Sequence, residues 1–157
     1  MAQSGAKAHE IEKCGEGDKM FGTYKHTIDA KGRLCIPASL REDLGETFYV
    51  TLWMEQCLVA HTKESWDKLM EKYNAMTARE QKRMRPILAH AAKCEVDGQG
   101  RIILPQELRE HVGLKKNVAV VGMGGRAEIW DAEQRAEIDA DETKLENLEE
   151  IFMELEV

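Results

Sequence analysis

Residues 28–45 read IDAKGRLCIPASLREDLG, and residues 96–113 read VDGQGRIILPQELREHVG. Aligned without gaps at an offset of 68, the two stretches share eight of their 18 residues: Asp, Gly, Arg, Pro, Leu, Arg, Glu and Gly. Ordinary residue frequencies predict about one chance identity in such a window. The sequence therefore contains an internal duplication, and the fold has to be predicted for a repeated unit.

Each copy is predicted to form a β-β-α-β-β unit. A first strand enters a tight Asp-x-x-Gly turn, where Gly32 and Gly100 can adopt the positive φ that the turn requires. After the second strand, a short helix begins at a proline and stops at a glycine, over 37–45 and 105–113. A hairpin completes each unit. The predicted strands are 23–28, 33–36, 48–54 and 57–61 in the first copy, and 92–96, 101–104, 117–122 and 126–130 in the second.

The predicted fold class is mainly β with accessory helices (α+β). One β-β-α-β-β unit has too small a core and too many open strand edges to be stable alone. Two copies that join into a pseudo-symmetric β-barrel would remove both problems.

The chain divides at its composition shifts. Residues 1–19 are polar and glycine-containing and are predicted to be a disordered arm. The repeats occupy 20–64 and 91–131, with a helical connector over 65–90, predicted as helices at 65–76 and 78–88. Residues 132–157 are predicted to form an acidic helix that docks on the domain or on a neighbouring subunit. Its apolar stripe is Leu145, Leu148, Ile151, Phe152 and Leu155.

The net charge of −7, from 22 basic and 29 acidic side chains, is unevenly distributed. Residues 132–157 hold two basic and ten acidic side chains, a net of −8. Residues 21–131 hold 17 basic and 15 acidic side chains, a net of +2. The acidic total therefore does not argue against a nucleic-acid-binding surface in the middle of the chain.

Composition also limits the function classes. No apolar run approaches the roughly 18 residues of a membrane span, and residues 1–20 lack the apolar segment of a secretory signal. The four cysteines form no CxxC pair, so a cytoplasmic protein with reduced thiols is expected.

In each turn an Asp and an Arg lie four residues apart: Asp29 with Arg33, and Asp97 with Arg101. The Asp carboxylates are expected to accept the turn amides. Each Arg either pairs with its Asp or is held outward, where its planar guanidinium suits a phosphate or a guanine edge.

Further basic residues extend the pattern. Lys31 adds a positive charge to the first turn, where the second turn has Gln99. Arg41 and Arg109 repeat on the short helices and are candidates either for DNA binding or for ion pairs to neighbouring glutamates. The connector cluster Arg79, Lys82, Arg83 and Arg85 is interpreted as a solvated helix face.

These residues resemble a known family. The stretch MFGTYKHTIDAKGRLCIP, the second copy CEVDGQGRIILP and the EIW at 128–130 resemble the MraZ family of bacterial transcriptional regulators, part of the AbrB/MazE group of swapped-hairpin DNA-binding proteins. The resemblance covers residues 20–131. It implies a pseudo-dimeric swapped-hairpin double β-barrel in one chain that assembles into a ring of subunits.

The resemblance also implies a function. It implies a cytoplasmic, nucleoid-associated repressor that binds double-stranded DNA at short direct repeats upstream of the cell-division and cell-wall gene cluster. The signature arginines correspond to Arg33 and Arg101, and the signature aspartates to Asp29 and Asp97. The related group also has a basic residue three positions before the Asp. That position holds His26 in the first copy, where Lys25 can substitute, and Cys94 in the second copy.

Other function classes find less support in the sequence. His90 and Cys94, or His9 and Cys14, do not make a four-ligand zinc set. The glycines at 122–125 lack the Lys and Ser/Thr of a phosphate-binding loop, and no nucleophile motif is present. We therefore expect no enzyme, cofactor, metal or small-molecule substrate. The main alternative is an AbrB-like interaction module, such as an antitoxin, acting through a protein partner.

Overall fold

The computed structural model describes residues 18–157 of the chain. Nearly all of the arm expected over 1–19 lies outside these residues. The first unit comprises β1 (Thr23–Thr27), β2 (Arg33–Cys35), α2 (Ala38–Leu44), β3 (Thr47–Leu52) and β4 (Leu58–Thr62), followed by α3 (Lys63–Asn74), α4 (Ala78–Arg83) and α5 (Arg85–Ala89). The second comprises β5 (Ala92–Glu95), β6 (Arg101–Ile103), α6 (Gln106–His111), β7 (Asn117–Gly122) and β8 (Arg126–Asp131), followed by α7 (Ala132–Glu142) and α8 (Leu145–Leu155).

The two units exchange their first strands. The main sheet is antiparallel with the order β1-β7-β8-β4-β3-β5, so β1 pairs with the second unit and β5 pairs with the first. Equivalent backbone bonds follow each exchanged strand: Ile28 N donates to Lys116 O at 2.9 Å, and Val96 N donates to Glu46 O at 2.8 Å. The mainly β, α+β fold of two duplicated units is thereby confirmed.

The remaining strands, β2 and β6, form a separate two-stranded ribbon. Leu34 pairs with Ile102, its own counterpart at the offset of 68, so the pseudo-twofold axis passes through this pair. A single bridge between Ile28 and Leu34 connects the ribbon side to β1. In the described residues the hydrogen-bonded ladders do not continue into a closed barrel, and the ribbon covers one end of an open sheet instead.

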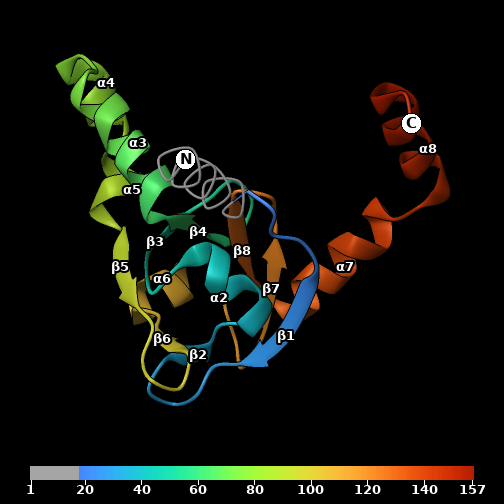
Figure 1. Ribbon diagram of the computed structural model, residues 1–157, viewed down its shortest axis with the longest axis horizontal. Coiled ribbons are helices and arrows are strands. Elements are labelled where there is room, and N and C mark those ends of the chain that lie inside the picture. The colour runs from blue at the N-terminus through green and yellow to red at the C-terminus, as the bar shows by residue number, and fades with distance from the viewer. Residues whose placement is uncertain (1–17) are drawn as a thin grey trace, which may run out of the picture.

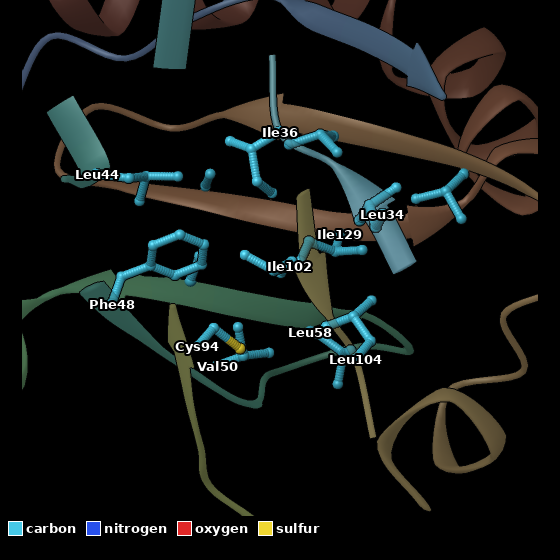
Figure 2. Packing of buried hydrophobic residues seen from close by; sticks show 14 of the residues in the cluster. Leu34, Ile36, Leu44, Phe48, Val50, Leu58, Cys94, Ile102, Leu104 and Ile129 are labelled. Atoms are coloured by element: carbon cyan, nitrogen blue, oxygen red, sulfur yellow. The ribbon is translucent and has the colours of Figure 1, made fainter. Parts of the chain in front are cut away.

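One hydrophobic core serves both units, as Figure 2 shows. Equivalent residues of the duplicated stretch both contribute to it: Leu34 and Ile102, which pair with each other, and Ile36 and Leu104, all at most 2% exposed. Phe48 and Val50 of β3 complete it with Ile129 of β8. Because neither unit encloses these residues alone, the two copies are expected to fold together.

Each unit is followed by a helical arm, and Figure 1 shows the two arms extending away from the end that carries β2 and β6. The connector helices lie where predicted, but 78–88 is divided at Met84, because Pro86 has no amide hydrogen and its ring collides with a carbonyl one turn earlier.

The acidic segment is divided too, into α7 and α8. At the break, Thr143 Oγ1 donates to Asp139 O at 2.8 Å and Asn147 Nδ2 donates to Asp141 O at 2.9 Å. These side chains satisfy carbonyls at the end of α7, so the chain turns before the second helix begins.

Candidate nucleic-acid interface

The first turn is held by its own aspartate. Asp29 Oδ1 accepts the amides of Lys31 and Arg33, each at 2.9 Å, and Asp29 Oδ2 accepts Arg33 Nε at 2.6 Å. Gly32 lies at φ 81°, and its amide donates to Asp29 O at 3.0 Å. The carboxylate therefore fixes both the turn and the direction of the arginine.

The second turn repeats the same contacts. Asp97 Oδ1 accepts the amides of Gln99 at 2.8 Å and Arg101 at 2.9 Å, and Asp97 Oδ2 accepts Arg101 Nε at 3.0 Å. Gly100 lies at φ 78°. In both turns the amides and the guanidinium hold the pKa of the aspartate below its ordinary value, the amide of the Arg being the largest cause.

The ribbon brings these two arginines onto one outer surface. Leu34 and Ile102 point into the core, so strand alternation places Arg33 and Arg101 on the opposite face. Arg33 pairs in register with Ile103, and Arg101 pairs with Cys35, so the two arginines are diagonal neighbours, a spacing of about 7–8 Å.

Each arginine pairs with its aspartate through one nitrogen only. Nε of each arginine bonds its own aspartate. Among the described residues, the terminal nitrogens Nη1 and Nη2 of Arg33 and Arg101 make no hydrogen bond or ion pair. The side chains retain 32% and 28% exposure. Each guanidinium thus has its two outer nitrogens available to a ligand.

Arg41 and Arg109 lie behind the turns, each against the turn of the other unit. A Cβ at Gly100 would collide with the Arg41 guanidinium, and one at Gly32 would lie 3.0 Å from Arg109 Nη2. Arg109 Nε also donates to Leu104 O at 3.0 Å. In residues 18–157 neither arginine pairs with the glutamate that follows it, so both contribute positive charge and packing beneath the ribbon.

Lys31 is exposed on the first turn. Lys25 and His26 lie instead along β1, where they line a groove of about 380 Å³ with Glu133 and Ala136 of α7. No hydrogen bond or ion pair within the described chain joins either residue to the turns. The structure therefore groups Lys31 with the arginines and places Lys25 and His26 beside the second arm.

The ribbon surface also holds two residues that the sequence analysis did not select, Cys35 and Ile103. Ile103 is 65% exposed although it lies in a strand. Side chains alternate along a strand, so Cys35 in Arg-Leu-Cys and Ile103 in Arg-Ile-Ile lie on the same face as the arginines. The sequence could have predicted this only if the pairing of the two strands had been known.

The described residues that were considered for a metal site or a phosphate-binding loop can now be placed in the fold. Over residues 18–157, no three His, Cys, Asp or Glu side chains are placed to hold a metal; His9 and Cys14 lie outside that range. His90 contacts Glu107, while burial raises the pKa of Cys94 to about 12. Gly122 ends β7, and Gly124 and Gly125 lie in the turn between β7 and β8.

None of the described helices has the length and apolarity to cross a bilayer. The connector cations Arg79, Lys82, Arg83 and Arg85 are exposed, in line with the interpretation of a solvated face.

Comparison with known proteins finds one family model and several relatives that carry the same family name. The family described as "MraZ protein, putative antitoxin-like" matches residues 20–85 and 87–150, one match for each unit. A protein named transcriptional regulator MraZ from Heliobacterium modesticaldum is 46% identical over 73% of this chain and 82% of its own length. The protein of the same name from Oenococcus oeni is 44% identical over 86% of this chain and 95% of its own length. The one from Ligilactobacillus salivarius is 45% identical over 83% of this chain and 92% of its own length.

Among solved structures, the solution structure of PHS018 from Pyrococcus horikoshii covers 68% of this chain and 92% of its own at 16% identity. Its TM-score of 0.32 is too low to indicate a shared fold.

Proposed function

The chain belongs to the MraZ family, and from that membership and the geometry of its two turns we propose that it is a sequence-specific DNA-binding transcriptional regulator. Its relatives are named as transcriptional regulators, which is not an enzyme class. The observation that carries the proposal is the pair of aspartate-oriented arginines on the outer face of the β2–β6 ribbon.

The ribbon suits the major groove of DNA. A two-stranded antiparallel ribbon fits that groove, where an arginine can donate two parallel hydrogen bonds to O6 and N7 of guanine. Arg33 and Arg101 are fixed by Nε and present Nη1 and Nη2, which leaves a directed donor edge. Lys31 adds a positive charge at the rim that can contact a phosphate.

The finer function follows from repetition of this surface. We propose that the protein represses transcription by binding short direct repeats upstream of the cell-division and cell-wall gene cluster, in the cytoplasm and at the nucleoid. One ribbon covers only a short site. Several copies held together would bind successive repeats, with affinity gained through effective concentration.

The two arms offer a means of assembly into a ring. Residues 63–90 carry seven basic and four acidic side chains, a net of +3, whereas residues 132–157 carry a net of −8. The arms extend from different sides of the molecule (Figure 1). Contact between the basic arm of one copy and the acidic arm of the next is a head-to-tail association, which closes into a ring when the rotation permits.

A second function is favoured by one observation. The apolar face of α8 is exposed, with Leu145 at 71% and Phe152 at 54%, and such a surface suits a protein contact. An interaction module acting through a different protein, like an antitoxin, would use this face and leave the ribbon arginines without a role.

The experiment that separates these functions uses the full chain and DNA with two or more direct repeats. Fluorescence anisotropy at fixed salt should show binding to the repeats well above binding to a scrambled duplex of equal length. Sedimentation velocity of the same sample should show a homo-oligomer. Failure to prefer the repeats, with stable capture of a different protein through α8, would support the interaction module instead.

A further inference from the structure

A cavity of about 630 Å³ lies where the connector arm meets the sheet, away from the ribbon. Its walls come from α3 and α5 on one side and from β3, β4 and the start of β8 on the other. The size is within the range of small-molecule sites. The lining includes Thr51, Trp53, His61, Leu69, Ile87 and Arg126.

The sheet side of the cavity holds buried polar groups. His61 is 8% exposed, and its Nε2 lies 2.9 Å from Thr51 Oγ1, which is 1% exposed. The guanidinium carbon of Arg126 lies 4.9 Å from the centre of the Trp53 ring. Nε of Arg126 is buried and, within the described residues, has no hydrogen-bond partner. An unsatisfied buried donor is costly unless a ligand or water completes it.

The duplication provides an internal comparison. In the register of the two hairpins, Thr51 and His61 of the first unit correspond to Val121 and Trp130 of the second. Val121 and Trp130 pack in an apolar cluster, against which Ile138 of α7 also lies. The second unit is therefore filled mainly with apolar groups at the place where the first unit is hollow and polar, although Glu128 and Arg135 also contact Trp130 there.

The hollow is thus not required by the shared fold. A cavity without a role costs packing energy, and the second unit shows that apolar side chains can fill this place. The lining combines an apolar wall, with Leu69 and Ile87 from the arm, and the partly buried cation Arg126. It also includes the carboxylates of Asp18 and Glu64. At the rim, Lys68 is paired with Glu64 at 3.4 Å, while Lys72 makes no ion pair among the described residues.

We propose that this cavity binds a small organic anion with a flat, apolar body. The acidic group accepts from Arg126, the body packs between Trp53 and the apolar residues of α3 and α5, and His61 with Thr51 offers a further polar contact. The ligand would join the connector arm to the sheet. This proposal goes beyond DNA binding and does not depend on it.

The test compares two probes with the same aromatic frame. 1-Anilinonaphthalene-8-sulfonate carries the acidic group, and N-phenyl-1-naphthylamine lacks it. Both are titrated by fluorescence into the full chain. We expect one saturable site per chain for the sulfonate. Arg126→Gln should weaken the sulfonate by about tenfold or more, the size of a lost charge-assisted hydrogen bond, and leave the neutral probe unchanged.

Three further variants define the site. Leu69→Trp should fill the cavity and abolish binding of both probes. Lys82→Gln removes an exposed cation outside the cavity, and Phe152→Ser alters the apolar face of α8; neither should change binding. Retention of the neutral probe by Arg126→Gln shows that this variant keeps the fold around the cavity.

The proposal is overturned by any of three results. The first is absence of saturable sulfonate binding to the unaltered chain. The second is equal sulfonate affinity for Arg126→Gln. The third is unchanged binding of the probes to Leu69→Trp. Loss of binding in Phe152→Ser would overturn it equally, because it would place the site on α8.

Discussion

The turn arginines use one nitrogen for structure, and we propose that they use the other two for recognition of DNA. Nε of Arg33 and Arg101 completes the contacts of its own aspartate, which leaves Nη1 and Nη2 to a ligand. Lysine could not divide its role in this way, because its single ammonium has no fixed planar geometry. The aspartates are accordingly positioning residues, whereas the arginines are proposed to touch DNA.

Asp97→Asn tests this division. The Asn side chain keeps one oxygen that can accept the backbone amides of the turn. Its NH2 group, however, cannot accept a hydrogen bond from Arg101 Nε, as the second carboxylate oxygen does. We expect weaker binding to repeated DNA by anisotropy, with Arg101 still present, and a circular dichroism spectrum that is unchanged. Unaltered affinity would show that the aspartate does not orient the arginine.

The turn glycines are required for two reasons at once. Gly100→Ala places a methyl group against Arg41 in a backbone at φ 78°. The left-handed conformation alone costs about 1–2 kcal/mol for a residue with a Cβ. Chemical denaturation should therefore show a lower free energy of unfolding.

Gly98 in the same turn provides the matched control. A Cβ there meets nothing within 4 Å, so Gly98→Ala should change the free energy of unfolding by less than about 0.5 kcal/mol. If Gly98→Ala and Gly100→Ala lowered the free energy of unfolding equally, the positive φ of Gly100 and its contact with Arg41 would not explain the loss.

His61 makes stability depend on pH. Burial, helped by the nearby charge of Arg126, lowers the pKa of His61 below its ordinary value. His61 therefore takes up a proton more readily in the unfolded chain than in the folded one. Its contribution to the free energy of unfolding is complete above about pH 6.5, the ordinary pKa of histidine, and is lost as the pH falls from there toward the pKa in the folded chain.

Thermal melts at about pH 7.5 and about pH 5.5 should show a lower Tm at the acidic pH. In His61→Gln the difference in Tm between the two conditions should shrink. If the variant retains the full difference, other groups cause the pH dependence.

At the scale of elements, the duplicated stretch made most of the fold predictable. Pro37, Gly45 and their counterparts bounded the short helices, and the Asp-x-x-Gly turns located β1, β2, β5 and β6 within two residues. These features are local, and they depend on backbone requirements that only certain residues meet.

The sequence could not show which strands pair. The exchange of β1 and β5 between units, and the pairing of β2 with β6, are contacts between residues far apart in the chain. For that reason the diagonal placement of Arg33 and Arg101, and the exposure of Ile103 beside them, were not predicted. The hollow at Thr51 and His61 was missed as well, because its polar residues come from different strands.

The α8 helix is predicted to act in assembly. Its stripe of Leu145, Leu148, Ile151, Phe152 and Leu155 is exposed along one side, although α8 also carries four glutamates between 146 and 154. Leu148→Ser with Phe152→Ser should lower the assembly state in sedimentation velocity and leave the Tm of the core unchanged. Met153→Ser, on the other side of the helix, is the control and should not dissociate the oligomer.

At the scale of the whole molecule, the shared core makes the two units one cooperative structure. Leu34→Ala removes a fully buried side chain on the pseudo-twofold axis, a change that costs about 2–5 kcal/mol in protein cores. Hydrogen exchange should show the loss of protection in the β3–β4 and β7–β8 hairpins alike. Protection lost in the first hairpin alone would mean that the units fold separately.

In the proposed function, the ribbon is the surface for DNA and the two arms are the surfaces for other copies of the chain. Binding through many copies of a weakly basic face should depend strongly on salt, since each phosphate contact releases counterions. The acidic arm need not oppose DNA, because Figure 1 shows it extending away from the ribbon end.

The most direct test measures anisotropy of DNA with direct repeats, at one salt concentration, for the unaltered chain and for Arg33→Ala with Arg101→Ala. Each lost guanine contact is worth about 1–3 kcal/mol, so the double variant should lose specific binding. Its free energy of unfolding should remain within about 1 kcal/mol of the parent value, as is usual for surface changes. Undiminished binding by the folded double variant would contradict the assignment of the ribbon as the DNA-binding surface.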